Sequence, residues 1–346
     1  MRNGIVGSDE KKIDDKQSSD LLSFSHNYQR KAAIAWGKAT DHAGRVYIKP
    51  MKTFNLNKTI FSTLEGKLSR ALIQSKIAKD VYWNEKAASD IEKDFQKVIK
   101  EAQIPKIEEE LIQFLHDECD FSSEHADGSF LEHLFFCYEY SAVHFPEQPP
   151  LVMLLHSILG TGTNTWAMPK EKIPMLQKLV SEKEMLHIEA FPSFLRLLYL
   201  PDFLGGLLKN LPRLDRLKSV SFHRVIDNKP LTIDAENFWV QLNYQLIHYI
   251  DFLPPANWPF HCSDTFIQNF AELSLFLDKV NKRMAKVIFP IPSFDIKSVV
   301  QEDLSVGSRF AVFIPASLKK QAAIKSIQSF SKRIGHSLDF SFSWKS

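Results

Sequence analysis

The sequence predicts a mostly α-helical protein, and two observations support this. Apolar residues recur at three- and four-residue spacing through most of the 346-residue chain, which is the pattern of amphipathic helices. Strand-like alternation occurs only in two short stretches, 308–315 and 338–344. The chain contains no internal repeat and no low-complexity tract, so we expect helices packed around a hydrophobic core.

The composition excludes several classes of protein. Apolar residues make up 44% and charged residues 24%, as in water-soluble globular proteins, and a formal charge of +2 does not suggest a nucleic-acid partner. The 3 cysteines are far apart and lack a CxxC pair, which argues against disulfides or a zinc knuckle. The chain shows no signal-peptide core and no apolar run of membrane-spanning length. We therefore expect a soluble, cytoplasmic protein without a membrane partner.

The first half of the chain begins with a polar segment and continues in helices. Residues 1–56 lack sustained periodicity, and we expect them to form a flexible lead. Apolar faces at helical spacing then predict helices over 58–83, 87–102 and 106–119, with Pro105 separating the last two.

Two further helices enclose a proline-rich connection. Ser129 and Glu132 have the spacing of a capping box, which predicts a helix from there to about His144. Pro149 and Pro150 cannot lie inside a helix, so a second helix should begin near Leu151 and end near Gly160. Such a short link favours antiparallel neighbours.

The second half is expected to be helical as well. The pattern over 168–191 is interrupted by Pro174, whereas Thr232 should open a long helix that closes at Pro254. Further helices are predicted over 264–289 and from 316 to Gly335, a residue typical of helix ends.

Two histidines lie within apolar helix faces, which sets them apart as candidate site residues. His133 and His156 have mainly apolar neighbours three and four positions away, so both rings should point inward. A buried ring without a partner costs about 1–3 kcal/mol. On the helix after Thr232, Asn243 shares an apolar face with Trp239, whereas His248 falls on a more polar face. Asn243 is therefore the predicted partner.

The stretches "HADGSFLEHL" (125–134) and "LLHSILGT" (154–161), followed by a polar residue on a later helix, resemble the HD-domain superfamily. More narrowly, the chain is similar to an uncharacterised HD-like family of unknown function, over about residues 105–255. The resemblance implies an HD-domain-like helical bundle over 57–255 with extra N- and C-terminal helices. Residues 256–346 would form a C-terminal helical extension that packs on it.

The resemblance also implies a site. His125, His133 and His156 would hold one divalent transition metal such as Fe, Zn or Mn, since imidazole suits these ions better than magnesium. Asn243 would take the distal acidic position, with Glu132 as outer support. Ser157 replaces the aspartate of the His-Asp pair, and serine is a poor ligand for hard cations, so a bridged two-metal centre is not expected.

Each of these residues also has a purely structural interpretation. His133 and His156 can form a hydrogen-bonded inner pair, His125 can sit in the turn before its helix, and Glu132 can serve the capping box. Cys137 shares the helical face of His133, but apolar surroundings would raise the pKa of its thiol and disfavour a nucleophile. Arg224 is a candidate for holding a phosphate or carboxylate, or is a surface residue.

Two functions therefore follow from the sequence. The first is a metal-dependent hydrolase, acting on a phosphoester or related small molecule, or an HD-type oxygenase. The second is a catalytically decayed HD-like binding or scaffold protein, which the missing aspartate favours. The substrate and the oligomeric state are not indicated by the sequence.

Overall fold

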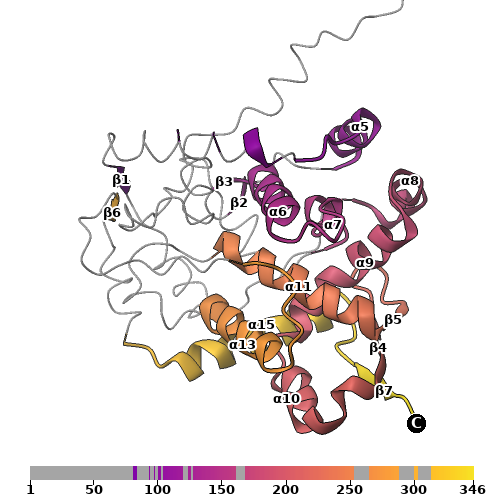
Figure 1. Ribbon diagram of the computed structural model, residues 1–346, viewed down its shortest axis with the longest axis vertical. Helices are drawn as coiled ribbons and strands as arrows, with labels where there is room; N and C mark the ends of the chain where they lie inside the picture. Colours follow the sequence, from indigo (N-terminus) through magenta and orange to yellow (C-terminus); the bar gives the residue numbers. More distant parts are fainter. Residues whose placement is uncertain are drawn as a thin grey trace, which may run out of the picture.

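The computed structural model confirms a mostly α-helical fold with one small sheet (Figure 1). It describes residues 81–83, 93, 97, 100–102, 104–119, 124–125, 128–160, 168–252, 265–287, 300–302 and 313–346. The predicted lead over 1–56 lies outside the described residues.

The first described element is a strand where the sequence predicted the end of a helix. β1 (Val81–Trp83) pairs antiparallel with β6 (Val300–Glu302). The prediction of helix through residue 83 is therefore wrong at its end, because a run of β-branched and aromatic residues favours a strand once a partner strand is present. Helix α5 (Glu109–Glu118) is confirmed, with Leu111, Phe114 and Leu115 buried.

The next segment carries the candidate site. A short hairpin of β2 (Glu124–His125) and β3 (Gly128–Ser129), which was not predicted, leads into α6 (Phe130–His144). The bounds of α6 confirm the helix that the capping pattern predicted. Helix α7 (Leu151–Leu155) is shorter than predicted. It continues as hydrogen-bonded turns to Gly160, whose φ of 134° lies in the region that favours glycine.

In the following segment, Pro174 lies at the start of a helix rather than interrupting one, whereas Pro192 lies inside a later helix. The 3-10 helix η2 (Lys170–Lys172) leads into α8 (Ile173–Leu179), where Pro174 lies in the first turn. Helix α9 (Glu182–Leu197) starts at a complete capping box between Ser181 and Glu184, which separates it from α8. Helix α10 (Pro201–Lys209) and the 3-10 helix η3 (Leu211–Arg216) follow.

A three-stranded antiparallel sheet, in the order β5-β4-β7, was only partly predicted. The predicted strand over 338–344 is confirmed as β7 (Ser341–Trp344), which pairs with β4 (Leu217–His223). On the other side of β4 lies β5 (Pro230–Asp234). Because β5 contains Thr232, the prediction that this residue opens a helix is wrong.

Helix α11 (Ala235–Phe252) starts where β5 ends and lies in the middle of the molecule. The side chain of Asp234 accepts a hydrogen bond from the Asn237 backbone at 2.8 Å and so caps the helix. In Figure 1, α11 crosses between α6 and α7 on one side and α13 (Thr265–Lys279) and α15 (Ala316–Arg333) on the other. It also contacts α9 and β4, so nearly every face of α11 meets protein.

The C-terminal segment is joined to the same core. Helix α13 ends ten residues before the predicted 289, and Asn281 follows with a φ of 53°. Helix α15 ends as predicted before Gly335, at φ 72°, where the amide of His336 donates to the carbonyl of Ser331. Phe340, Phe342 and Trp344 pack against the main hydrophobic cluster, which contains buried residues of α9, α11 and α13.

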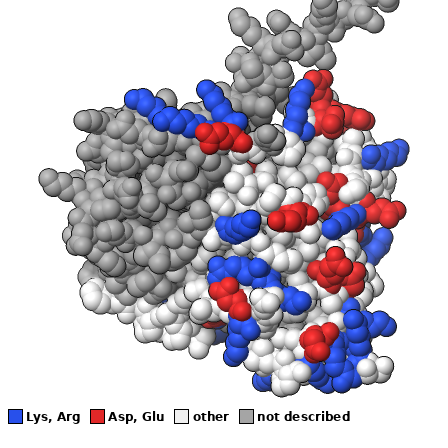
Figure 2. Space-filling model, in the orientation of Figure 1, with Lys and Arg blue, Asp and Glu red and all other residues white. Residues whose placement is uncertain are grey.

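Two surface observations complete the fold. Among the residues that the structure describes, no helix combines the length and apolar character needed to cross a membrane. Acidic and basic side chains are interspersed over the described surface in Figure 2. The predicted absence of a nucleic-acid partner stays a prediction.

Candidate metal centre

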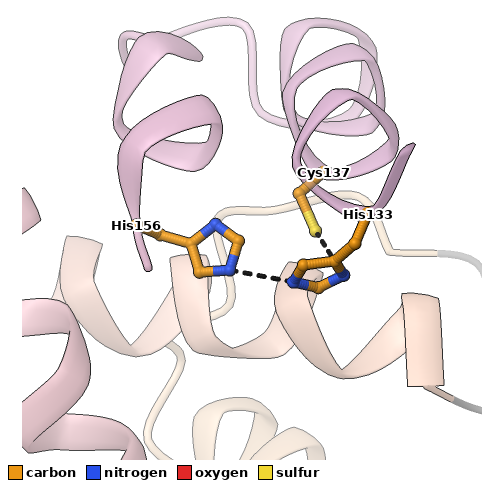
Figure 3. Close-up of side chains that lie close together, drawn as sticks. All are labelled: His133, Cys137 and His156. Atoms are coloured by element: carbon orange, nitrogen blue, oxygen red, sulfur yellow. Dashed lines mark hydrogen bonds between the residues drawn. The ribbon is translucent and has the colours of Figure 1, made fainter. Parts of the chain in front are cut away.

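Four buried polar residues from three elements meet beside α11. His133 comes from α6, His156 follows the last residue of α7, and His248 and Asp251 come from α11. All four are at most 4% exposed. Cys137, one turn after His133 on α6, is fully buried beside them. Figure 3 shows the Cys137 sulfur near the His133 ring, and a nitrogen of the His156 ring facing a nitrogen of the His133 ring.

The Nδ1 atom of each paired histidine is held by an acceptor. Nδ1 of His133 lies 2.6 Å from Oδ2 of Asp251, and Nδ1 of His156 lies 2.6 Å from the carbonyl oxygen of Met153. A carboxylate and a carbonyl can only accept, so each Nδ1 carries the hydrogen and donates it. This fixes the orientation of both rings.

The two remaining nitrogens face each other. Nε2 of His133 lies 3.0 Å from Nε2 of His156 (Figure 3). If both rings are neutral and protonated at Nδ1, each Nε2 carries only a lone pair, and two lone pairs at this distance repel. A cation bound by the two Nε2 atoms removes this repulsion. The cation is either a proton or a metal ion.

The cluster contains a group that can hold a metal ion. Ligand atoms of His133, Cys137 and His156 lie within 4.8 Å of one another. Cys137 was considered from the sequence only as a nucleophile. Its spacing of four residues from His133 on a helix was the signal for a shared ligand role.

The sequence did not show which polar face of α11 meets the two histidines. His248 was predicted on a more polar face, but it is 3% exposed and lies within the histidine cluster. Asp251 was not considered, although its three-residue spacing from His248 puts both on one helical face. The reason is tertiary: α11 is enclosed on most sides, so its polar face meets other helices rather than water.

Asn243 has a different role from the predicted one. Its Nδ2 donates to the carbonyls of Trp239 at 2.8 Å and Lys282 at 2.9 Å, and its Oδ1 accepts from the amides of Met284 and Ala285. The side chain therefore fixes the segment after α13 to α11. Its donors and acceptor are used there, so Asp251 replaces Asn243 as the polar partner that α11 gives to the histidines.

Three other predicted residues lie near the cluster in the chain. The backbone of His125 forms the β2–β3 hairpin just before α6, and its side chain lies outside the described residues. Glu132 precedes His133 and is partly exposed, and Ser157 is buried in the turn after His156. The roles predicted for these residues stay predictions.

Arg224 is engaged by carboxylates rather than held ready for a phosphate. Its Nε donates to Asp227 at 3.0 Å, and its terminal nitrogens form ion pairs with Asp227 and Glu189. Burial lowers the pKa of Arg224, but these bonds and charges outweigh it and raise the pKa overall. Two acidic neighbours neutralise the guanidinium, which leaves Arg224 poorly suited to bind a phosphate or carboxylate.

Comparison with family models, curated proteins and solved structures finds no match for this chain. The resemblance to the HD-like family is thus neither supported nor contradicted by these comparisons. What the fold and the site define is a mostly α-helical protein with a buried histidine–cysteine group that can bind a metal ion.

Proposed function

We propose that the protein is a metal-dependent enzyme of HD-like type that holds one transition-metal ion between His133 and His156. The observation that carries the proposal is the 3.0 Å approach of two Nε2 atoms whose rings both donate through Nδ1. Metal-bound histidines in proteins commonly donate their other nitrogen to a carboxylate or a backbone carbonyl. Here Asp251 and the Met153 carbonyl take these two positions.

The donor atoms favour certain metals. Imidazole nitrogen and thiol sulfur suit zinc, iron or copper, whereas magnesium and calcium prefer oxygen ligands. Asp251 supports this choice because its Oδ2 is bonded to Nδ1 of His133 and so orients that ring, as carboxylates beside metal-bound histidines commonly do.

The reaction proposed first is hydrolysis of a small-molecule ester, including a phosphoester, as the resemblance to the HD superfamily implies. When bound, the ion supplies Lewis acidity and an activated water for such a reaction. The chain contributes the fixed orientation of His133 and His156 and a surrounding of buried apolar side chains. Oxygenation is the alternative chemistry if the ion is iron.

A non-catalytic HD-like binding or scaffold protein is the second candidate. One observation favours it: a single proton shared between the two Nε2 atoms also satisfies the pair, with Asp251 balancing its charge. Ser157 beside His156 supplies no carboxylate, unlike the His-Asp pair of the HD superfamily.

Metal analysis of the purified full-length chain, prepared without a histidine tag, separates the two candidates. We expect about one metal ion per chain in the parent protein and none in a His133→Ala, His156→Ala double variant. His187→Ala is the matched control, because His187 is equally buried but bonded only to amide side chains. Circular dichroism of each variant checks that it folds.

The result that overturns the proposal is equally clear. If the parent binds no zinc, iron or manganese after reconstitution with each, the histidines share a proton and the scaffold function stands. If the double variant keeps its metal while His187→Ala loses it, the site lies elsewhere in the chain.

A further inference from the structure

His248 supplies the third imidazole of the cluster, at a position that suits a third metal ligand. The ring centre of His248 lies 5.2 Å from that of His133 and 4.8 Å from that of His156, and the latter two are 5.0 Å apart. The three rings thus form a nearly equilateral triangle. They come from three different elements, α6, the end of α7, and α11.

These spacings match imidazoles gathered around one ion. A zinc–nitrogen bond is about 2.0–2.1 Å, and the nitrogen lies about 1.1 Å from its ring centre. Two imidazoles at a tetrahedral angle therefore have ring centres about 5 Å apart. Edge-to-face packing of aromatic rings gives similar distances, so the spacing alone does not separate a ligand from a packing residue.

Among the side chains that the structure describes, Cys137 is the other candidate for the third ligand, and it approaches His133 near the wrong nitrogen. Its sulfur lies 4.0 Å from Nδ1, the atom already bonded to Asp251. An ion bound between the two Nε2 atoms must lie in the plane of the His133 ring, beyond Nε2. Figure 3 shows the sulfur over the ring instead of at that edge.

We infer that His248, rather than Cys137, is the third ligand of the metal proposed above, an inference that rests on the proposed function. Rotation about the Cβ–Cγ bond redirects the nitrogens of an imidazole while its ring centre hardly moves, so the ring-centre distances hold for any orientation of the His248 ring. Helix α11 then supplies both a ligand and, three residues later, the carboxylate that orients His133. Three neutral imidazoles and the single carboxylate of Asp251 would leave a divalent ion with a net positive charge, which favours an anionic small molecule as substrate.

Cobalt substitution tests this ligand set directly. Co²⁺ bound to a thiolate gives a near-ultraviolet charge-transfer band, which is absent when only imidazoles and oxygen atoms bind. We expect the cobalt-loaded full chain to lack this band and Cys137→Ser to bind cobalt as tightly as the parent. We expect His248→Gln to weaken binding by more than about 100-fold, beyond the loss typical of outer-shell partners.

Each outcome decides between the possibilities. A charge-transfer band in the parent that disappears in Cys137→Ser overturns the inference, as does a folded His248→Gln variant that binds cobalt normally. If the parent binds no cobalt at all, the proposed function itself fails. Circular dichroism and urea unfolding of His248→Gln show whether a lost affinity reflects a lost fold.

Discussion

Two buried histidine sites on α11 differ in the chemistry of their partners. In the first, His133 is bonded to the carboxylate of Asp251 and meets a second imidazole. In the second, His187 of α9 lies between two amide side chains, with Nδ1 2.8 Å from Gln241 and Nε2 3.1 Å from Asn237. Both sites join α11 to neighbouring helices, but only the first contains a charged partner.

The His187 site is satisfied by a neutral ring. The amide nitrogen of Asn237 donates to Asp234 at 3.0 Å, so its oxygen faces His187 and accepts from Nε2. Nδ1 then accepts from the Gln241 amide, whose oxygen and nitrogen exchange places by a half turn about the last side-chain bond. Burial lowers the pKa of His187 and keeps the ring neutral.

The difference shows what separates a structural histidine from a candidate ligand. At His187, both nitrogens find complementary neutral partners, and nothing further is required. At His133 and His156, acceptors occupy both Nδ1 atoms, so the pair requires a cation. The partners, rather than burial, therefore distinguish the two sites.

The largest expected effect comes from removing the charged partner. In the metal-free protein, Asp251→Ala should lower the free energy of unfolding by about 3 kcal/mol or more, since it removes the acceptor of the buried Nδ1–H of His133. Asp251→Asn should cost less because an acceptor remains. Gln241→Met, the matched change at His187, should cost about 1 kcal/mol. Equal losses in urea unfolding for Asp251→Ala and Gln241→Met would remove the distinction between the sites.

Acid should destabilise the protein through two other buried histidines, His144 and His336. Burial lowers the pKa of His144 and of His336 from 6.5 to about 4. The folded state then favours the neutral ring. The contribution of each ring to the free energy of unfolding is therefore fully present above pH 6.5 and is lost as the pH falls toward 4. The expected loss is about 3 kcal/mol for each residue.

Urea unfolding at several pH values checks this sign. His336→Gln should flatten the dependence between pH 6.5 and 4, because glutamine preserves donor and acceptor but does not titrate. A variant with the same slope as the parent would show that His336 does not contribute to acid unfolding.

The variant Asn243→Ala tests whether Asn243 lies outside the proposed metal site. Asn243→Ala should lower the free energy of unfolding by about 2 kcal/mol, because the buried amide of Ala285 and the part-buried backbone groups of Lys282 and Met284 lose their partner. It should leave the metal content unchanged. Loss of metal from a folded Asn243→Ala protein would restore the sequence-based prediction and weaken the role given to Asp251.

The smallest expected effect concerns the turn that follows His156. A Cβ at Gly160 would lie 2.9 Å from Cγ1 of Val225, and the φ of 134° disfavours any side chain. Gly160→Ala should therefore cost about 1–2 kcal/mol. Val225→Ala in the same chain should recover only the steric part. Thermal unfolding of the single and double variants measures both parts, and an unchanged midpoint for Gly160→Ala would contradict the strain.

Local periodicity predicted the helices whose signals lie within a few residues. The apolar face of α5, the start of α6 and the end of α15 before Gly335 all followed from spacing and capping residues. The same approach found His133 and His156, because each lies among apolar neighbours on its own element. It missed the hairpin of β4 and β5, in which β4 also pairs with the C-terminal β7, a strand distant in the chain.

The sequence by itself therefore determined a mostly helical chain with two inward histidines. Only the tertiary structure decided what those histidines meet. Because α11 is enclosed by helices on opposite sides, both of its polar faces are buried, and periodicity cannot tell which one serves the site. Packing assigned Asn243 to the segment after α13 and brought His248 and Asp251 to the histidine pair.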